Sequence, residues 1–128
     1  RSGSLIPYIV DALKRGVQPA LNGAFNQNDF VHVSDVAQAV CKSLEHTQSY
    51  AVLNVGSGNS TRVLDIAMKT AQMFHVPFDH SQYKPPTAIP HAFWADIRRA
   101  EAQLGWYPRV SIQEGIERCI KFANEGKR

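Results

Sequence analysis

Residues 51–61 read Ala-Val-Leu-Asn-Val-Gly-Ser-Gly-Asn-Ser-Thr, and they open the stretch that decides the fold class. The first five residues are typical of a short buried strand, and the Gly-Ser-Gly run predicts a turn. The apolar positions of residues 61–74 then predict a helix. A strand, a glycine turn and a helix in succession form an α/β unit, so the chain is predicted to mix helices and strands.

Further elements are predicted on both sides of this unit. Helices are expected over residues 7–15, 34–46 and 96–104, and from the capping box Ser111-Ile112-Gln113-Glu114 onward. A strand is expected at 29–33, and residues 77–90, which contain four prolines, predict a long irregular loop. The prediction is one small α/β domain over residues 1–128, with about five helices and short strands.

Composition excludes several classes of protein. The chain has 128 residues, 44% of them hydrophobic, and a net charge of +3, which is typical of one globular domain. Two cysteines are too few for a disulfide scaffold, and no apolar run reaches the roughly 18 residues of a membrane helix. We therefore expect a reducing, cytoplasmic context. The 14 Lys and Arg residues are scattered among 11 Asp and Glu residues, so no nucleic-acid partner is predicted.

The run Gly56-Ser57-Gly58 has the context of a dinucleotide fingerprint, because it follows a predicted strand and precedes a predicted helix. Asp79, about twenty residues later, would be the acid on a ribose hydroxyl. The third glycine position, however, holds Thr61. We therefore predict a turn that only joins the strand to the helix.

Other candidate sites are weaker. The five histidines and two cysteines show no spacing typical of a metal site, so no metal ligand is predicted. Trp94 and Trp106 each lie near a predicted helix end, where tryptophan usually packs in the core or at its edge. Both are therefore predicted to pack there.

Five motifs, in this order and spacing, resemble a known family. They are residues 5–7 opening a helix, then 29–39, 53–58, 95–97 and 104–108 before a final helix that begins Ser-x-x-Glu-Gly. Together they cover essentially the whole chain. The sequence resembles the C-terminal half of the extended short-chain dehydrogenases, the NAD(P)-dependent sugar-nucleotide epimerases and dehydratases.

The resemblance implies that the catalytic parts lie elsewhere. In that family an N-terminal Rossmann domain carries the glycine-rich cofactor loop and a Tyr-x-x-x-Lys pair. No tyrosine of this chain has a lysine four residues later. We therefore predict no catalytic residue and no cofactor in this chain, NAD or NADP in the parent enzyme, and a Rossmann domain of the same parent as partner. Since the sequence starts with Arg directly before a helix, we expect a fragment.

The resemblance also implies a substrate site for a nucleotide-diphosphate sugar. Its residues are Asn28, Lys84, Pro7, Gly23 and His91. The family usually has a phosphate-binding arginine where Asn28 stands, and another where Lys84 stands. An amide carries no charge, and lysine is a point charge rather than a fork, so both departures weaken a phosphate site.

Two alternatives stay open. The parent could be a sterol- or hydroxy-compound-processing short-chain dehydrogenase, which needs no phosphate clamp. The chain could also be a stand-alone, non-catalytic nucleotide-binding module. If the chain is a fragment of a two-domain enzyme, removal of the partner domain would leave apolar surface exposed. We therefore expect dimerisation or aggregation of the isolated chain.

Overall fold

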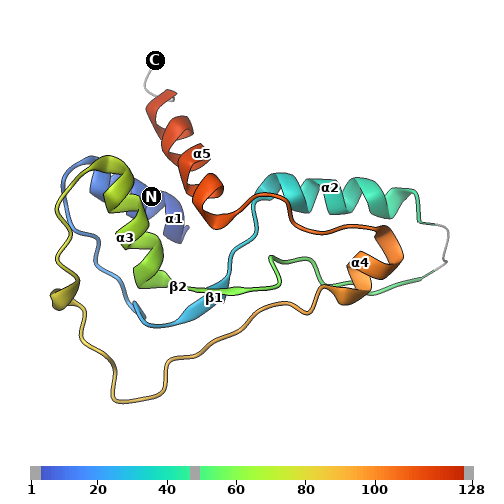
Figure 1. Cartoon of the computed structure of the whole chain (residues 1–128), viewed down its shortest axis with the longest axis horizontal. Coiled ribbons are helices and arrows are strands. Elements are labelled where there is room, and N and C mark those ends of the chain that lie inside the picture. Colours follow the sequence, from blue (N-terminus) through green and yellow to red (C-terminus); the bar gives the residue numbers. More distant parts are fainter. Residues whose placement is uncertain (1–3, 47–49, 126–128) are drawn as a thin grey trace.

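The computed structural model describes residues 4–46 and 50–125, which form helices around a very small sheet (Figure 1). The helices are α1 (Leu5–Lys14), α2 (Val33–Leu44), α3 (Val63–Phe74), α4 (Arg98–Leu104) and α5 (Ile112–Glu125), and a 3-10 turn, η1, spans His80–Gln82. Strands β1 (Gln27–Asp29) and β2 (Ser60–Arg62) pair antiparallel. The predicted small α/β fold with about five helices is confirmed.

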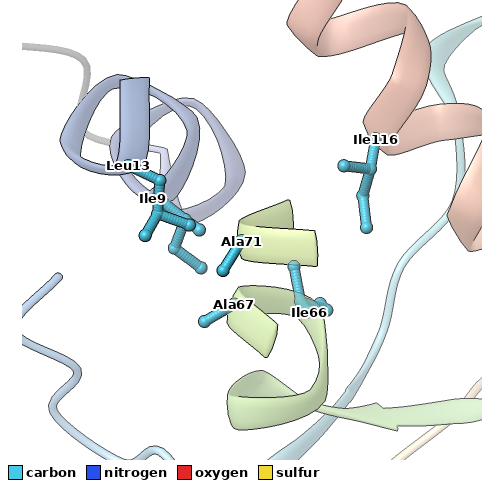
Figure 2. Packing of buried hydrophobic residues seen from close by; sticks show 6 residues of the cluster. All are labelled: Ile9, Leu13, Ile66, Ala67, Ala71 and Ile116. Carbon is cyan, nitrogen blue, oxygen red and sulfur yellow. The ribbon is translucent and has the colours of Figure 1, made fainter. Parts of the chain in front are cut away.

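One hydrophobic cluster lies where α1, α3 and α5 meet. Its buried members are Ile9 and Leu13 from α1, Ile66, Ala67 and Ala71 from α3, and Ile116 from α5 (Figure 2). Ile9 and Leu13 of α1 are four residues apart, as are Ala67 and Ala71 of α3, and Ile66 adjoins Ala67, so each helix turns one apolar face inward. Burying a single Ile or Leu side chain contributes about 1.5–3 kcal/mol. The two alanines leave room for the Ile and Leu side chains of α1.

A second hydrophobic cluster joins α2 to α4, which lie together at the right of Figure 1. Ala39 of α2 and Ala100 of α4 pack against Trp106, which is completely buried. The indole Nε1 of Trp106 donates to the carbonyl oxygen of Asp35 over 2.9 Å. The carboxylate of Asp35 accepts from the N–H of Val110 over 3.0 Å. The prediction that Trp106 packs in the core is confirmed.

The strand predicted at 29–33 is wrong except for its first residue. β1 ends at Asp29 because the chain then leaves the sheet to begin α2. His32 is the N-cap of that helix, and its Nδ1 accepts from the N–H of Ser34 over 3.2 Å. This cap lies before the Ser34 or Asp35 expected from the sequence, because an imidazole nitrogen replaces the usual side-chain oxygen.

The buried strand predicted at 51–55 is also wrong. No backbone hydrogen bond joins these residues to any other described residue, and the side chain of Val52 is 60% exposed. A strand requires a neighbouring strand to pair its N–H and C=O groups. Within residues 4–46 and 50–125, no strand lies beside this segment.

Three helices, α1, α3 and α4, begin two residues from the expected positions, at Leu5, Val63 and Arg98. α3 begins at Val63 rather than 61, because Thr61 belongs to β2 and pairs with Asn28 of β1. At the start of α5, Ser111 Oγ accepts from the N–H of Glu114 over 3.2 Å, as a capping box requires. The Glu114 carboxylate instead accepts from Arg118 over 2.6 Å, so only half of the box forms.

The segment between α3 and α4 is irregular, as predicted for 77–90, apart from the short η1. It follows the lower left and lower edge of the molecule in Figure 1. Trp94, near its end, is 57% exposed, so of the predicted packing in the core or at its edge, the core position is wrong. No helix within the described segments has the length and apolar character needed to cross a membrane.

Candidate functional site

The glycine turn is built around the carboxylate of Asp29. Its two oxygens accept from the N–H of Ser57 over 2.6 Å and of Gly58 over 3.3 Å. The N–H of Ala95 donates to the same carboxylate over 3.0 Å. A Cβ atom on Gly56 would lie 2.5 Å from an Asp29 oxygen and 2.7 Å from the Cβ of Ala95. Only glycine fits this close approach of three segments.

The charge of Asp29 decides what this turn can bind. Burial alone would raise the pKa of Asp29, but hydrogen bonds from Ser57, Ala95 and Gly58 outweigh it and hold the pKa below the usual 3.8. A fixed carboxylate therefore occupies the N–H groups that a dinucleotide fingerprint would offer to pyrophosphate. The turn does not fit NAD or NADP, and it leads into β2 rather than directly into a helix.

Asp79, the acid considered for a ribose hydroxyl, has a local structural role. Its Oδ1 accepts from the N–H of Ser81 over 2.9 Å and from the Ser81 hydroxyl over 2.6 Å, which caps η1. Its backbone pairs with the side chain of Gln18: the Asp79 N–H donates over 2.9 Å, and the Asp79 carbonyl accepts over 2.6 Å. These contacts anchor the irregular segment near the residues that follow α1.

Asn28 and His91, two of the predicted substrate-binding residues, are in contact. His91 Nε2 lies 3.1 Å from Asn28 Oδ1. Because an amide oxygen only accepts, this hydrogen bond requires a proton on Nε2. The backbone holds the pair in register: the N–H of Gln27 donates to the carbonyl of His91 over 2.9 Å, and the N–H of Phe93 donates to the carbonyl of Gln27 over 3.2 Å. A third segment therefore lies beside β1.

Lys84 and Gly23 lie on the two segments that lead to this pair. The Tyr83 hydroxyl donates to the carbonyl of Pro19 over 2.6 Å, so Lys84 follows a residue fixed against the segment after α1. Lys84 is exposed and makes no ion pair within the described part of the chain. Gly23 has a φ of +78° and accepts from the N–H of Asn26 over 2.9 Å, as a tight turn requires. No hydrogen bond joins Lys84 to Asn28.

Pro7 lies apart from the other four predicted residues. It is in the first turn of α1 and lines a groove of about 720 Å³ between α1 and α5, together with Tyr8, Phe122 and Arg118. It also lines a smaller cavity of about 280 Å³ beside Val33. Neither lining includes Asn28, Lys84, Gly23 or His91.

Sequence reasoning missed the residues that hold this region together. Asp29 belongs to a motif already noted, but nothing in its spacing shows that its carboxylate binds a turn 28 residues later. Gln18 and Tyr83 likewise pair with residues more than sixty positions away. Such pairs depend on tertiary contacts, so a single sequence carries no signal for them.

Comparison with known proteins matches the chain to sugar-nucleotide enzymes in each case. The family model for GDP-mannose 4,6 dehydratase matches residues 2–119. A putative UDP-glucose 4-epimerase of Methanocaldococcus jannaschii is 28% identical over 125 residues, which is 97% of this chain and 40% of the relative. The UDP-glucose 4-epimerase of Neisseria meningitidis serogroup C is 30% identical over 129 residues, 89% of this chain and 37% of the relative. The chain thus spans well under half of each.

Solved structures share the fold. The Bordetella bronchiseptica enzyme WbmF in complex with NADH superposes with a TM-score of 0.85 at 22% identity, covering 96% of this chain and 37% of WbmF. MoeE5 in complex with UDP-glucuronic acid and NAD superposes with a TM-score of 0.77 at 28% identity, covering 98% of this chain and 43% of MoeE5. Since the family model matches nearly the whole chain, this protein belongs to the GDP-mannose 4,6-dehydratase family of the extended short-chain dehydrogenases.

Proposed function

We propose that this chain is the substrate-binding part of an NAD(P)-dependent sugar-nucleotide epimerase or dehydratase. In this proposal Asn28, His91, Lys84 and Gly23 face the nucleotide diphosphate. The observation that carries it is the hydrogen bond between Asn28 and His91. It brings together two residues that are 63 positions apart and that the family resemblance assigns to one site.

The contact orients the amide of Asn28 for binding an anion. Because its oxygen accepts from His91, its NH₂ group remains as a pair of donors with no hydrogen-bond partner among the described residues. The neighbouring Asp29 carboxylate binds the glycine turn, as expected for successive strand residues that point to opposite faces. Its negative charge is therefore directed away from a phosphate beside Asn28.

Lys84 supplies positive charge in this proposal. It is exposed and has no carboxylate partner in residues 4–46 and 50–125, so its ammonium is available to a phosphate. Pro7 remains a prediction, and a role for it requires the substrate to extend into the groove between α1 and α5.

The cofactor and the catalytic residues are assigned to the rest of the parent protein. WbmF has been solved with NAD+ and UDP, and MoeE5 with UDP-glucuronic acid and NAD. The glycine turn of this chain, the segment most similar to a dinucleotide loop, is occupied by Asp29. The N-terminal Rossmann partner, a homodimer and the cytoplasmic context all stay predictions.

Isothermal titration of UDP and dTDP into the full-length parent tests the proposed site. We expect binding of a nucleotide diphosphate, weakened about 10-fold by Lys84→Ala and strengthened by Asn28→Arg, which introduces a bidentate donor. Lys121→Ala, a change at an exposed lysine of α5, is the matched control and should leave affinity unchanged. Absence of heat with any nucleotide diphosphate would refute the proposal.

A second candidate is an uncharged substrate, as in a hydroxy-compound dehydrogenase. The neutral Asn28 favours it, and so do the exposed side chains of Phe93 (58%) and Trp94 (57%) next to His91. Binding of an uncharged alcohol, unaffected by Lys84→Ala, would support this candidate. Nucleotide binding by a protein whose reading frame lacks Tyr-x-x-x-Lys would instead support the non-catalytic module.

A further inference from the structure

Asn22 and Gly23 form an exposed Asn-Gly pair in the turn between α1 and β1. Asn-Gly is a preferred sequence for tight turns because both residues tolerate a positive φ, and Gly23 has one, at +78°. The fold requires this glycine, since a Cβ atom here would overlap the side-chain amide nitrogen of Asn26. Replacing Gly23 would therefore strain the turn, so the pair is a fixed feature of this chain.

The groups that can react in this pair are accessible. The side chain of Asn22 is exposed, and the N–H of Gly23 donates no hydrogen bond within residues 4–46 and 50–125. Glycine has no side chain that could shield its backbone nitrogen. The nitrogen of Gly23 can therefore approach the amide carbon of the Asn22 side chain.

Asn59 is exposed as well, but its environment differs. Its Nδ2 donates to the carbonyl of Ser57 over 3.3 Å, and its N–H donates to the hydroxyl of Ser57 over 3.2 Å. The next residue, Ser60, begins β2 and has a side chain that shields its nitrogen. Asn59 thus provides an internal reference for an exposed asparagine without a following glycine.

We infer that Asn22 is a site of spontaneous deamidation, which converts it to aspartate and isoaspartate. The deprotonated nitrogen of Gly23 attacks Cγ of Asn22 and closes a succinimide ring, while the amide nitrogen takes up a proton and leaves as ammonia. Water then opens the ring. Cleavage at Cγ gives aspartate, and cleavage at the main-chain carbonyl gives isoaspartate, whose main chain runs through the β-carbon. One water is consumed and one ammonia released, and no cofactor or nucleotide takes part, so the modification is independent of the proposed substrate site.

The same turn caps α3. Arg62, the N-cap residue of α3, makes no side-chain capping hydrogen bond. Instead, the N–H of Leu64 donates to the carbonyl of Ala24 over 2.8 Å, and the N–H of Val63 donates to the carbonyl of Asn26 over 3.0 Å. The first N–H groups of a helix have no partner within the helix, so the turn satisfies two of them.

Isoaspartate at residue 22 lengthens the main chain just before this cap. The added methylene extends the chain by about 1.5 Å, the length of one C–C bond. A displacement of that size moves the carbonyl of Ala24, two residues further along, beyond hydrogen-bonding distance of the N–H of Leu64. Aspartate adds the same negative charge without lengthening the chain, and a negative charge near a helix N-terminus is not destabilising. Isoaspartate is therefore the product that disturbs α3.

Peptide mapping by mass spectrometry of the full-length parent, incubated in warm, mildly alkaline buffer, tests the modification. Alkaline pH raises the deprotonated fraction of the Gly23 nitrogen. We expect Asn22 to exchange its NH₂ group for OH at least about 10-fold faster than Asn59, because glycine leaves the attacking nitrogen unshielded. Asn22→Gln, which would have to close a larger ring, should show no conversion at this position. A rate at Asn22 no higher than at Asn59 would overturn the inference.

Hydrogen exchange tests the effect on α3. The amides of Val63 and Leu64 should exchange about 10-fold faster in the isoaspartate fraction than in fresh protein, because the cap that protects them is lost. Asn22→Asp carries the new charge without the added methylene, so it is the matched control and should exchange like fresh wild type. Exchange in the isoaspartate fraction equal to that of Asn22→Asp would overturn the assigned effect on α3.

Discussion

Replacing Asp29 by asparagine tests whether one carboxylate connects the sheet, the glycine turn and the segment before α4. Asparagine keeps the shape of the side chain but only one acceptor oxygen. It can therefore accept from the N–H of Ser57, as at 2.6 Å, or from the N–H of Ala95, as at 3.0 Å. Its NH₂ group would then face the N–H that is left, and two donors cannot form a hydrogen bond. The contact from Gly58, at 3.3 Å, is weaker and adds little.

The expected cost follows from these contacts. A hydrogen bond to a charged group contributes about 1.5–3 kcal/mol, and Asn loses at least one of them. Because Asp29 is partly exposed, water can relieve some of the loss, so we expect a decrease of about 2 kcal/mol in the free energy of unfolding. For a chain of this size that lowers the melting temperature by about 6–10 °C.

Urea unfolding followed by circular dichroism measures this change. Asp11→Asn is the control, because its ion pair with Arg15 is exposed and contributes at most about 1 kcal/mol. The pKa of Asp29 is lowered in the folded chain, so its charge stabilises above the unfolded value of about 4, and this stabilisation is lost as pH falls through the folded pKa. The difference between wild type and Asp29→Asn should therefore shrink below pH 4. Equal losses for the two variants, or a difference independent of pH, would refute the reasoning.

Three further pairs of substitutions give distinct expected results in the same urea assay. Gly56→Ala should destabilise by about 1–3 kcal/mol because its Cβ has no room, whereas Gly115→Ala, in ordinary contact, should stabilise by about 0.5–1 kcal/mol. Trp106→Ala should cost about 3–5 kcal/mol, and the exposed Trp94→Ala under about 1 kcal/mol; similar costs would contradict the assigned core. His32→Ala should cost about 1 kcal/mol, whereas His32→Asp should keep the α2 cap and cost little.

Local patterns in the sequence predict the helices well. The apolar spacing of α1, α3 and α5 reflects a single buried face on each helix, and that face is visible without knowing what it packs against. The position of Trp106 near a predicted helix end also predicts its packing correctly, but the same argument fails for Trp94, which is 57% exposed. The irregular character of 77–90 follows from its prolines.

The strands are predicted poorly because they depend on partners. The apolar run 51–55 reads as a buried strand, yet the described chain contains no strand beside it. β1 and β2 are short and polar, so they carry no apolar alternation that a sequence pattern could show. The family resemblance assigns Asn28 and His91 to one site, but their contact and the anchoring role of Asp29 are visible only in the structure.

A crystal structure of the full-length parent with UDP tests the central claim most directly. We expect diphosphate oxygens within about 3.5 Å of the Asn28 amide nitrogen or the Lys84 ammonium, with the Asp29 carboxylate still bound to the glycine turn. Diphosphate bound instead to the N–H groups of Ser57 and Gly58, with Asp29 displaced, would contradict it.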